Sequence, residues 1–174
     1  MTGKQFLKAV SNGKEDTVRI FLDALASAKT DYCVIGGLAV NAYVEPVISL
    51  DVDIIVAAKN VETLLKTVEK CFKIEHFPHS VNLSTKKSDL RIQLQTDPRY
   101  EDFISRAEVR KVLGYKMKVA SLEDVLQGKI WACLDKERRK SKRQKDLADI
   151  ARLIEAYPRL KTRLPDEIRK SIEE

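Results

Sequence analysis

Hydrophobic residues recur along this chain with two different periods, and each period predicts one kind of secondary structure. In residues 15–28 they return at three- and four-residue steps, which is the spacing of one apolar helix face. In residues 90–95 they alternate with polar residues, which is the spacing of a strand with one buried face. The pattern predicts helices over residues 4–10, 15–28, 38–44, 61–71, 99–108, 121–135 and 141–156, and a terminal helical turn within 165–174. It predicts strands over residues 32–35, 50–57, 72–77, 81–83, 90–95, 109–113 and 116–119.

Capping and turn residues support several of these boundaries. Pro46 ends the helix over 38–44, because proline disfavours helical geometry in the residue before it. Asn60 and Ser121 each precede a predicted helix and have side chains that cap a first turn. Gly114 separates two alternating segments and predicts a hairpin.

Strands that alternate with helices predict an α/β (α+β) fold with a small mixed sheet flanked by helices. The length of 174 residues suits a single domain with a sizeable core. We expect residues 1–120 to hold an N-terminal helix and the sheet, and residues 121–174 to form a helical C-terminal part.

The composition is 44% hydrophobic and 33% charged, which is typical of a soluble globular protein and excludes a disordered chain. No apolar run approaches the roughly 20 residues of a membrane span, and residues 1–10 lack the apolar core of a signal peptide. We therefore expect a cytoplasmic protein with no membrane association. Cys33, Cys71 and Cys133 lack metal-ligand spacing, and we expect them to be reduced and mostly buried.

Positive charge is unevenly distributed along the chain. The net charge is +6, and residues 136–145 contain seven Lys or Arg and one Glu. A basic balance permits a polyanionic partner without requiring one. Such a run is either a solvated helix end or a surface that contacts the phosphate backbone of a nucleic acid, and both interpretations stay open.

The strongest chemical signal is a pair of aspartates that follows a pair of glycines. Asp51 and Asp53 are two apart in a predicted strand, so their side chains project from the same face. Two nearby carboxylates repel each other, and Mg²⁺ relieves that repulsion when substrate phosphates complete its ligands. Gly36 and Gly37 let the backbone approach a ligand and leave N–H groups for an anion. A tight turn with solvated acids explains each motif alone, but their order favours a triphosphate and metal site.

These residues resemble the signature of a known superfamily. Nucleotidyltransferases related to DNA polymerase β have a hydrophobic residue with Gly-Gly or Gly-Ser, followed by Asp-hydrophobic-Asp, and this chain has VIGGLAVNAYVEPVISLDVDIIV. It looks most like the small bacterial proteins akin to abortive-infection nucleotidyltransferase toxins. The later runs SLEDVLQGKIWA and KDLADIARL are also similar to that group, and the resemblance spans roughly residues 30–157.

The resemblance implies an enzyme that moves a nucleoside monophosphate from a nucleoside triphosphate onto an acceptor. Asp51 and Asp53 would be catalytic and would hold Mg²⁺ or Mn²⁺. Gly36 and Gly37 would meet the β- and γ-phosphates of the nucleotide. Ser49 would help to bind the nucleotide as a hydroxyl donor.

The superfamily normally has a third acid on a neighbouring strand, and Gln93 stands at its expected position. Glutamine carries no charge and cannot act as a base. Its presence therefore argues against catalysis but not against nucleotide binding. Asp89 and Asp97 each lie about 13 Å from Gln93 along an ideal strand. Asp89 is the stronger candidate for the third catalytic acid, in a register different from the expected one. A site with only two acids is the remaining alternative.

Two later helices carry further candidates. Lys129 borders an apolar stripe, and we favour its reaching the triphosphate as a point charge over its passing along the core to solvent. Trp131 is expected in the core. In the next helix, Lys145 and Asp149 are four apart, and Asp146 and Asp149 are three apart. A salt bridge is the first expectation for these residues, and a nucleotide- or acceptor-facing role is the alternative.

The leading hypothesis is a metal-dependent nucleotidyltransferase. Its acceptor is an RNA such as a tRNA end, a protein hydroxyl, or a small molecule such as an aminoglycoside, in that order. The alternative, motivated by Gln93, is a catalytically weak nucleotide- or RNA-binding protein on the same fold, as one component of a toxin–antitoxin system. A basic RNA-binding module with incidental acids comes third. The resemblance also makes a cognate antitoxin or toxin a candidate partner.

Overall fold

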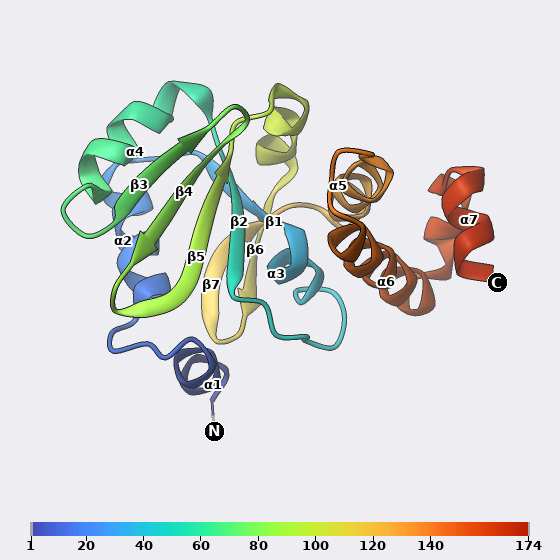
Figure 1. The fold of residues 1–174 in the computed structure, drawn as a ribbon, viewed down its shortest axis with the longest axis horizontal. Coiled ribbons are helices and arrows are strands. Elements are labelled where there is room, and N and C mark those ends of the chain that lie inside the picture. The colour runs from blue at the N-terminus through green and yellow to red at the C-terminus, as the bar shows by residue number, and fades with distance from the viewer. Residues whose placement is uncertain (1, 174) are drawn as a thin grey trace.

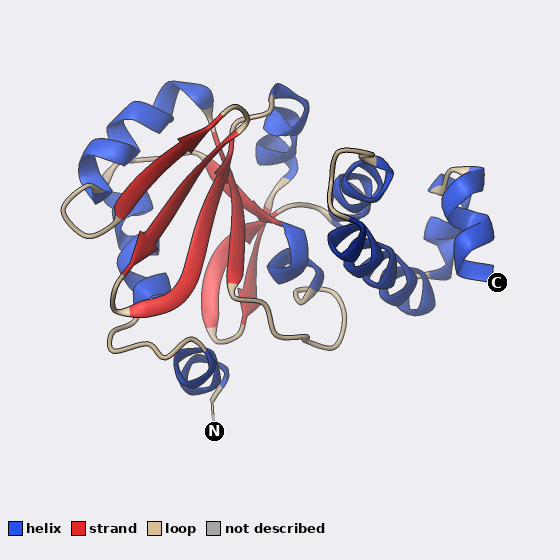
Figure 2. Cartoon of the chain, viewed as in Figure 1, coloured by secondary structure: helices blue, strands red, loops and turns tan. Residues whose placement is uncertain are grey.

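The computed structural model describes residues 2–173, and seven strands in this part of the chain form one mixed sheet (Figure 1, Figure 2). The strands are β1 (Tyr32–Ile35), β2 (Asp51–Val56), β3 (Lys73–Phe77), β4 (Ser80–Thr85), β5 (Ser88–Gln95), β6 (Glu108–Val112) and β7 (Tyr115–Val119). The α-helices are α1 (Gly3–Val10), α2 (Thr17–Ser27), α3 (Gly36–Val40), α4 (Val61–Val68), α5 (Leu122–Leu134), α6 (Lys140–Ala156) and α7 (Asp166–Glu173). The 3₁₀ helices are η1 (Ala58–Asn60), η2 (Pro98–Arg106) and η3 (Pro158–Arg163).

The strand order across the sheet is β3-β4-β5-β2-β1-β7-β6. The strand β2 pairs antiparallel with β1 and parallel with β5, and β1 pairs parallel with β7. The remaining pairs, β3 with β4, β4 with β5 and β6 with β7, are antiparallel. The predicted α/β fold with a mixed sheet is therefore confirmed. Each predicted strand is present, with its ends within two residues of the expected ones.

Alternating residues give β5 and the start of β2 one apolar and one polar face. In β5, Ile92 is buried, whereas the neighbouring Gln93 faces the other side and is half-buried. Helix α2 covers the apolar face, where its Val18 and Phe21 line one small hollow together with Ile92. Helices α2 and α4 lie behind the sheet in the view of Figure 1. The polar face of β2 and β5 is consequently left to line a cleft.

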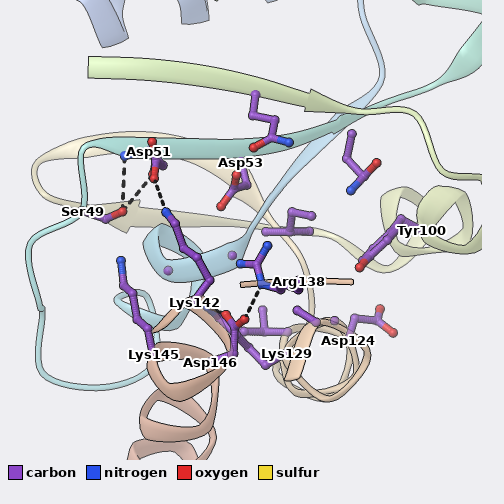
Figure 3. A pocket seen from close by; sticks show the side chains of 18 residues that line it. Ser49, Asp51, Asp53, Tyr100, Asp124, Lys129, Arg138, Lys142, Lys145 and Asp146 are labelled. Carbon is purple, nitrogen blue, oxygen red and sulfur yellow. Dashed lines mark hydrogen bonds and ion pairs between the residues drawn. The ribbon is translucent and has the colours of Figure 1, made fainter. Parts of the chain in front are cut away.

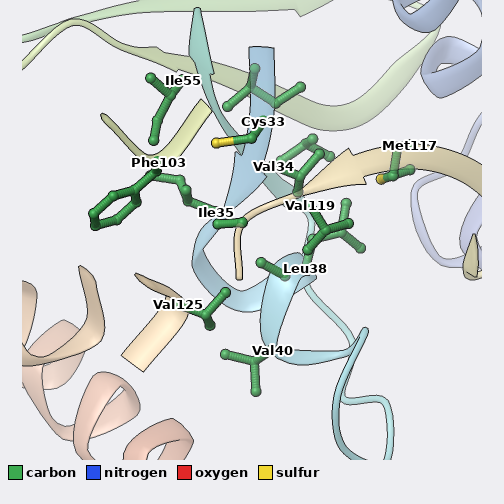
Figure 4. Packing of buried hydrophobic residues seen from close by; sticks show 14 of the residues in the cluster. Cys33, Val34, Ile35, Leu38, Val40, Ile55, Phe103, Met117, Val119 and Val125 are labelled. Carbon is green, nitrogen blue, oxygen red and sulfur yellow. The ribbon is translucent and has the colours of Figure 1, made fainter. Parts of the chain in front are cut away.

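The C-terminal helices share a hydrophobic core with the sheet. Figure 4 shows Ile35 of β1 and Val40 of α3 near Val125 of α5 and Phe103 of η2. All four side chains are buried and belong to the same cluster as the residues under α2. Burial of apolar surface at this junction holds α5 and α6 against the strand ends that carry the polar face.

Two predicted helices differ in the structure. The helix expected over 38–44 is the shorter α3, because the chain turns back after it and the Asn41 side chain bonds both backbone groups of Val47, at 2.7 and 2.9 Å. The helix expected over 99–108 is the 3₁₀ helix η2. The side chain of Asp97 caps η2 by accepting a hydrogen bond from the backbone N–H of Arg99 at 3.0 Å.

One predicted cap is present and another is wrong. The Oγ of Ser121 accepts the N–H of Asp124 at 3.2 Å at the start of α5. Asn60 makes no side-chain cap to α4. Its Oδ1 instead accepts the N–H of Asp31 at 3.2 Å, which ties α4 to the residue before β1.

The cysteines are free, with Cys33 and Cys133 buried and Cys71 exposed. No helix in the described part of the chain is long and apolar enough to cross a membrane.

Candidate active site

Asp51 and Asp53 extend from β2 into a cavity of about 210 Å³ between the sheet and the C-terminal helices (Figure 3). Val52 between them points to the buried face. In the register of the sheet, Asp53 lies beside Ile35 of β1 and beside Gln93 of β5. The alternation of β2 therefore places both carboxylates on one wall of one cavity.

The turn after β1 brings backbone close to these acids. Gly36 has a φ of +69°, and a Cβ built on it would overlap the carboxylate of Asp53, so this position accepts only glycine. A Cβ on Gly37 would meet only the side chain of Ser49, at an ordinary 3.8 Å. Both glycines and Ser49 line the cavity. The missing Cβ of Gly36 lets the backbone lie directly against the carboxylate of Asp53 in the cavity wall.

Ser49 fixes the start of β2. Its Oγ accepts the N–H of Asp51 at 3.3 Å and donates to the carbonyl oxygen of Asp51 at 3.2 Å. These bonds close a small turn immediately before the strand. The hydroxyl thus lies at the cavity wall beside Asp51 (Figure 3).

The two aspartates have different electrostatic surroundings. Arg91 of β5 places Nη2 2.8 Å from Oδ1 of Asp51, and Lys142 of α6 places Nζ 3.4 Å from Oδ2. Asp53 has no ion pair with any residue of 2–173. Burial raises the pKa of the Asp53 carboxyl; the Lys129 charge opposes this rise and the Asp51 charge adds to it. The ionised form of Asp53 therefore gains most from an added cation.

Lys129 lies at the centre of a buried ion network between α5 and α6. Its Nζ is 2.9 Å from Oδ1 of Asp146 and 2.7 Å from Oδ2 of Asp149. Arg138 contacts the other oxygen of Asp146 at 2.7 Å, and Arg152 contacts the other oxygen of Asp149 at 2.9 Å. Burial lowers the pKa of Lys129, but the two aspartates outweigh this effect and raise it. Lys129 is thus a charged structural centre as well as a residue of the cavity wall.

The salt bridge expected between Lys145 and Asp149 is absent from the described residues, because Lys129 and Arg152 occupy Asp149. Lys145 lines the cavity instead (Figure 3). Lys142 and Arg138 also line it. The basic run thus turns part of its charge into the cleft, a position compatible with the nucleotide- or acceptor-facing alternative for Lys145.

An aromatic and amide region forms the end of the cavity nearest η2. Tyr100 and Gln95 line it. Trp131 packs edge-on against Tyr100, with ring centroids 5.2 Å apart, and stacks on Phe103 at 5.7 Å. Trp131 therefore belongs to the packing of α5 on η2, as expected. No sequence pattern singled out Tyr100, which reaches the cavity only because η2 folds across the ends of β2 and β5.

The structure does not bring a third acid to the position beside Asp53. Gln93 occupies it, in the expected register. Asp89 is exposed and accepts a hydrogen bond from Asn12 at 2.6 Å, away from the cavity. Asp97 caps η2 and pairs with Arg99 at 2.7 Å. The assignment of Asp89 to the catalytic set is therefore corrected, because the shifted register that it requires does not occur.

The chemistry of the cavity suits a divalent cation shared with a phosphorylated substrate. Two carboxylates project together, and one of them has its charge disfavoured by burial. Among the described residues there is no group of three or more His, Cys, Asp or Glu that could hold a metal alone. Substrate oxygens would have to complete the ligands of Asp51 and Asp53, which is how Mg²⁺ is usually bound at phosphate sites.

A mixed sheet with a glycine turn at the end of one strand, paired aspartates on the next, and a basic helical wall defines a nucleotidyltransferase. The chain belongs to the AbiEii family, described as the nucleotidyl transferase AbiEii toxin of a Type IV TA system, whose family model matches residues 20–174. No curated protein matches the chain.

Solved structures of nucleotidyltransferases share the fold. The structure of ANT(2")-Ia in complex with adenylyl-2"-tobramycin has a TM-score of 0.61 at 14% identity, covering 90% of this chain and 94% of that chain. The lincosamide antibiotic adenylyltransferase LnuA, lincomycin-bound, has a TM-score of 0.57 at 15% identity, covering 81% of this chain and 98% of that chain. A putative nucleotidyltransferase from Thermotoga maritima has a TM-score of 0.51 at 17% identity, covering 74% and 84%. At these identities the likeness concerns the fold.

Proposed function

We propose that this protein transfers a nucleoside monophosphate from a nucleoside triphosphate to the end of an RNA, with Mg²⁺ or Mn²⁺ held by Asp51 and Asp53. The position of these two carboxylates carries the proposal. They lie side by side on one wall of a cavity whose opposite wall, on α5 and α6, is cationic. A metal–triphosphate complex needs both kinds of wall.

The triphosphate would lie between the glycine turn and α6. Gly36 and Gly37 allow close approach on the sheet side. Lys145 forms no ion pair with any residue of 2–172, so its charge is available to a phosphate. Lys142 would exchange Asp51 for a phosphate oxygen once the metal neutralises that carboxylate. Lys129 contributes positive potential behind these residues, since its amine already contacts two aspartates.

The chain's own residues would position and neutralise the reacting groups. The acceptor oxygen forms a bond to the α-phosphorus, the bond from that phosphorus to the bridging oxygen breaks, and pyrophosphate leaves. The bound metal would neutralise charge on the attacking and leaving oxygens. Lys142 and Lys145 would stabilise the negative charge that accumulates on the pyrophosphate.

Exposed basic residues next to a residue of the cavity wall support an RNA acceptor. Lys136 and Arg139 lie exposed at the turn between α5 and α6, and neither forms an ion pair with a described residue. They flank Arg138, which lines the cavity, whereas Lys140 faces a separate hollow against α7. Unpaired cations beside an active site suit the phosphate backbone of RNA better than a protein hydroxyl or a small antibiotic.

The test is incubation with each α-labelled nucleoside triphosphate, Mg²⁺ or Mn²⁺, and total RNA. We expect label to move onto RNA, and Asp51→Asn to lower the rate by about 10²–10³-fold or more, because the lost charge stabilises the transition state. Asp89→Asn is the matched control: it also removes one carboxylate of the sheet, but outside the cavity, and should keep full activity. Full transfer by Asp51→Asn would contradict the proposal.

A nucleotide-binding protein without turnover is the second candidate, and Gln93 beside Asp53 is the observation that favours it. It predicts tight, metal-dependent triphosphate binding with no labelled product in any extract. Because the family is that of a Type IV TA system, we also propose a cognate antitoxin as a partner. Labelled product that depends on Asp51 would exclude the second candidate.

A further inference from the structure

Asn82 of β4 has a buried oxygen atom without a partner. Its Oδ1 accepts no hydrogen bond from the described residues, although the atom is shielded from solvent. Buried polar atoms are normally paired, because leaving one unpaired costs much of its hydration energy. The neighbours of Asn82 therefore need to contain a donor.

The sheet register shows which side chains surround Asn82. It lies directly opposite Gln93 of β5 on one side and Glu75 of β3 on the other. Gln93 in turn lies opposite Asp53 of β2. Directly opposed residues point to the same face with Cβ atoms about 4.5–5.5 Å apart. Glu75, Asn82, Gln93 and Asp53 thus form one row that crosses the polar face and ends in the cavity.

Gln93 is the neighbour of Asn82 in this row that has protons to donate. The carboxylate of Glu75 accepts hydrogen bonds and has none to give. Ser80 and Ser84, on the same face of β4, lie about 7 Å along the strand, beyond the reach of a short hydroxyl. Gln93 has two amide protons on a side chain that lines the cavity and that makes no hydrogen bond with the described residues.

We infer that Asn82 orients Gln93: Nε2 of Gln93 donates to Oδ1 of Asn82, and Oε1 of Gln93 then faces the cavity beside Asp53. There it accepts a hydrogen bond from the attacking hydroxyl of the acceptor. Gln93 is in this way a catalytic residue that holds the nucleophile, and Asn82 is a positioning residue. The inference rests on the proposed transfer reaction.

Gln93 holds the hydroxyl but does not deprotonate it, since an amide oxygen is not a base at neutral pH. The acceptor oxygen bonds the α-phosphorus, pyrophosphate leaves, and the hydroxyl proton passes to water. The arrangement thus keeps the geometry of a three-residue site while replacing the charge of a third acid by a neutral oxygen.

The orientation is tested by NMR of side-chain amides in the full chain, which does not depend on activity. We expect one Nε2 proton of Gln93 to exchange slowly with water. Asn82→Leu, which is similar in size, should shift that resonance and remove the slow exchange. Asn82→Asp keeps an accepting oxygen and should preserve it. Fast exchange of both Gln93 protons in the wild-type protein would overturn the inference.

The catalytic consequence is tested by a double-mutant cycle in the RNA-labelling assay. Asn82→Leu should lower kcat/KM for the acceptor by about fivefold to tenfold, the equivalent of one hydrogen bond, and leave triphosphate affinity unchanged. In the Gln93→Met background it should cause no further loss. An equal loss in both backgrounds would show that Asn82 acts independently of Gln93, against the inference.

The outcomes separate this inference from the proposed function. Absence of transfer by the wild-type protein, with the same result for Asp51→Asn, counts against the transferase, whereas the amide resonances still decide the orientation of Gln93. Transfer that requires Asp51 but is indifferent to Gln93→Met supports the transferase and overturns the role of Gln93.

Discussion

Asp51 and Asp53 are only two residues apart, but their carboxylates have different electrostatic surroundings. Asp51 has two cationic partners, whereas burial disfavours the charge of Asp53. Gly36 determines how close backbone comes to Asp53, because a side chain there would occupy the place of its carboxylate. The site therefore depends on the absence of a side chain at Gly36 as much as on the two aspartates.

Gly36→Ala is expected to lower the free energy of unfolding by about 1–3 kcal/mol, because alanine is strained at a φ of +69° and its Cβ displaces Asp53. Nucleotidyl transfer should fall with it, since the displaced carboxylate leaves the metal position. Urea unfolding followed by circular dichroism, with the labelling assay, measures both.

Gly37→Ala provides the matched control. Its Cβ meets only ordinary contacts and its φ is not positive, so stability should equal that of the wild type or exceed it slightly. If both alanine variants unfold at the same urea concentration, the strain at Gly36 has been misjudged.

The helices α5 and α6 are joined by charge as well as by apolar packing. Lys129 of α5 binds two aspartates of α6, and the exposed fraction of its side chain is 7%. Removing one partner of a buried ion group leaves the other charges uncompensated. The position of α6 depends on this network. That position in turn places Lys142 of α6 within 3.4 Å of Asp51.

Lys129→Met should therefore destabilise the protein by about 3–5 kcal/mol, because Asp146 and Asp149 would remain buried with one cation fewer. Equilibrium unfolding in urea measures the loss. The loss should appear without nucleotide or metal, since the network is structural.

Lys66→Met is the control for removal of a lysine charge. Lys66 forms an exposed pair with Glu62 one turn away in α4, and such pairs contribute little. Its urea midpoint should match that of the wild type. A Lys129→Met midpoint equally close to the wild type would mean that the buried network does not hold α5 to α6.

In the whole molecule, acidic and basic walls face each other across one cleft. The polar sheet face supplies Asp51 and Asp53, and the opposite wall contains Lys129, Arg138, Lys142 and Lys145. Their separation along the chain means that the cleft exists only when α5 and α6 pack on the sheet. The surplus of positive charge is concentrated in the basic run of 136–145, which borders the cleft where we propose that RNA binds.

Replacing Lys136 and Arg139 together by glutamine should weaken RNA binding at low salt without affecting triphosphate affinity. Each lost contact with single-stranded RNA should reduce the slope of log K against log salt by about 0.7. Fluorescence anisotropy of a labelled RNA over a salt series measures the slope.

Lys116 and Lys118 make a matched control, because they are exposed on the β6–β7 hairpin and lie outside the cavity lining. Their replacement by glutamine removes the same charge. Equal losses from the two double variants would indicate binding to net charge rather than to the turn between α5 and α6.

Local sequence patterns were enough to predict the strands, because side-chain alternation and turn preferences act over a few neighbouring residues. They also predicted that Asp51 and Asp53 share a face. They misjudged Asn60, whose side chain binds Asp31 rather than the start of α4. The N–H groups at the start of α4 and the distant N–H of Asp31 compete for the same side-chain oxygen of Asn60. Only the folded chain shows which of them forms the hydrogen bond.

The identity of the residue beside Asp53 belongs to the tertiary structure. Parallel pairing of β2 with β5 places Gln93 there and leaves Asp89 at Asn12. Asp149 pairs with Lys129 rather than with Lys145, and Tyr100 lies in the cavity. Both results also depend on packing between distant segments. Periodicity within the chain predicts which face of an element is polar, but the contacts between elements arise from long-range packing, which leaves no local pattern.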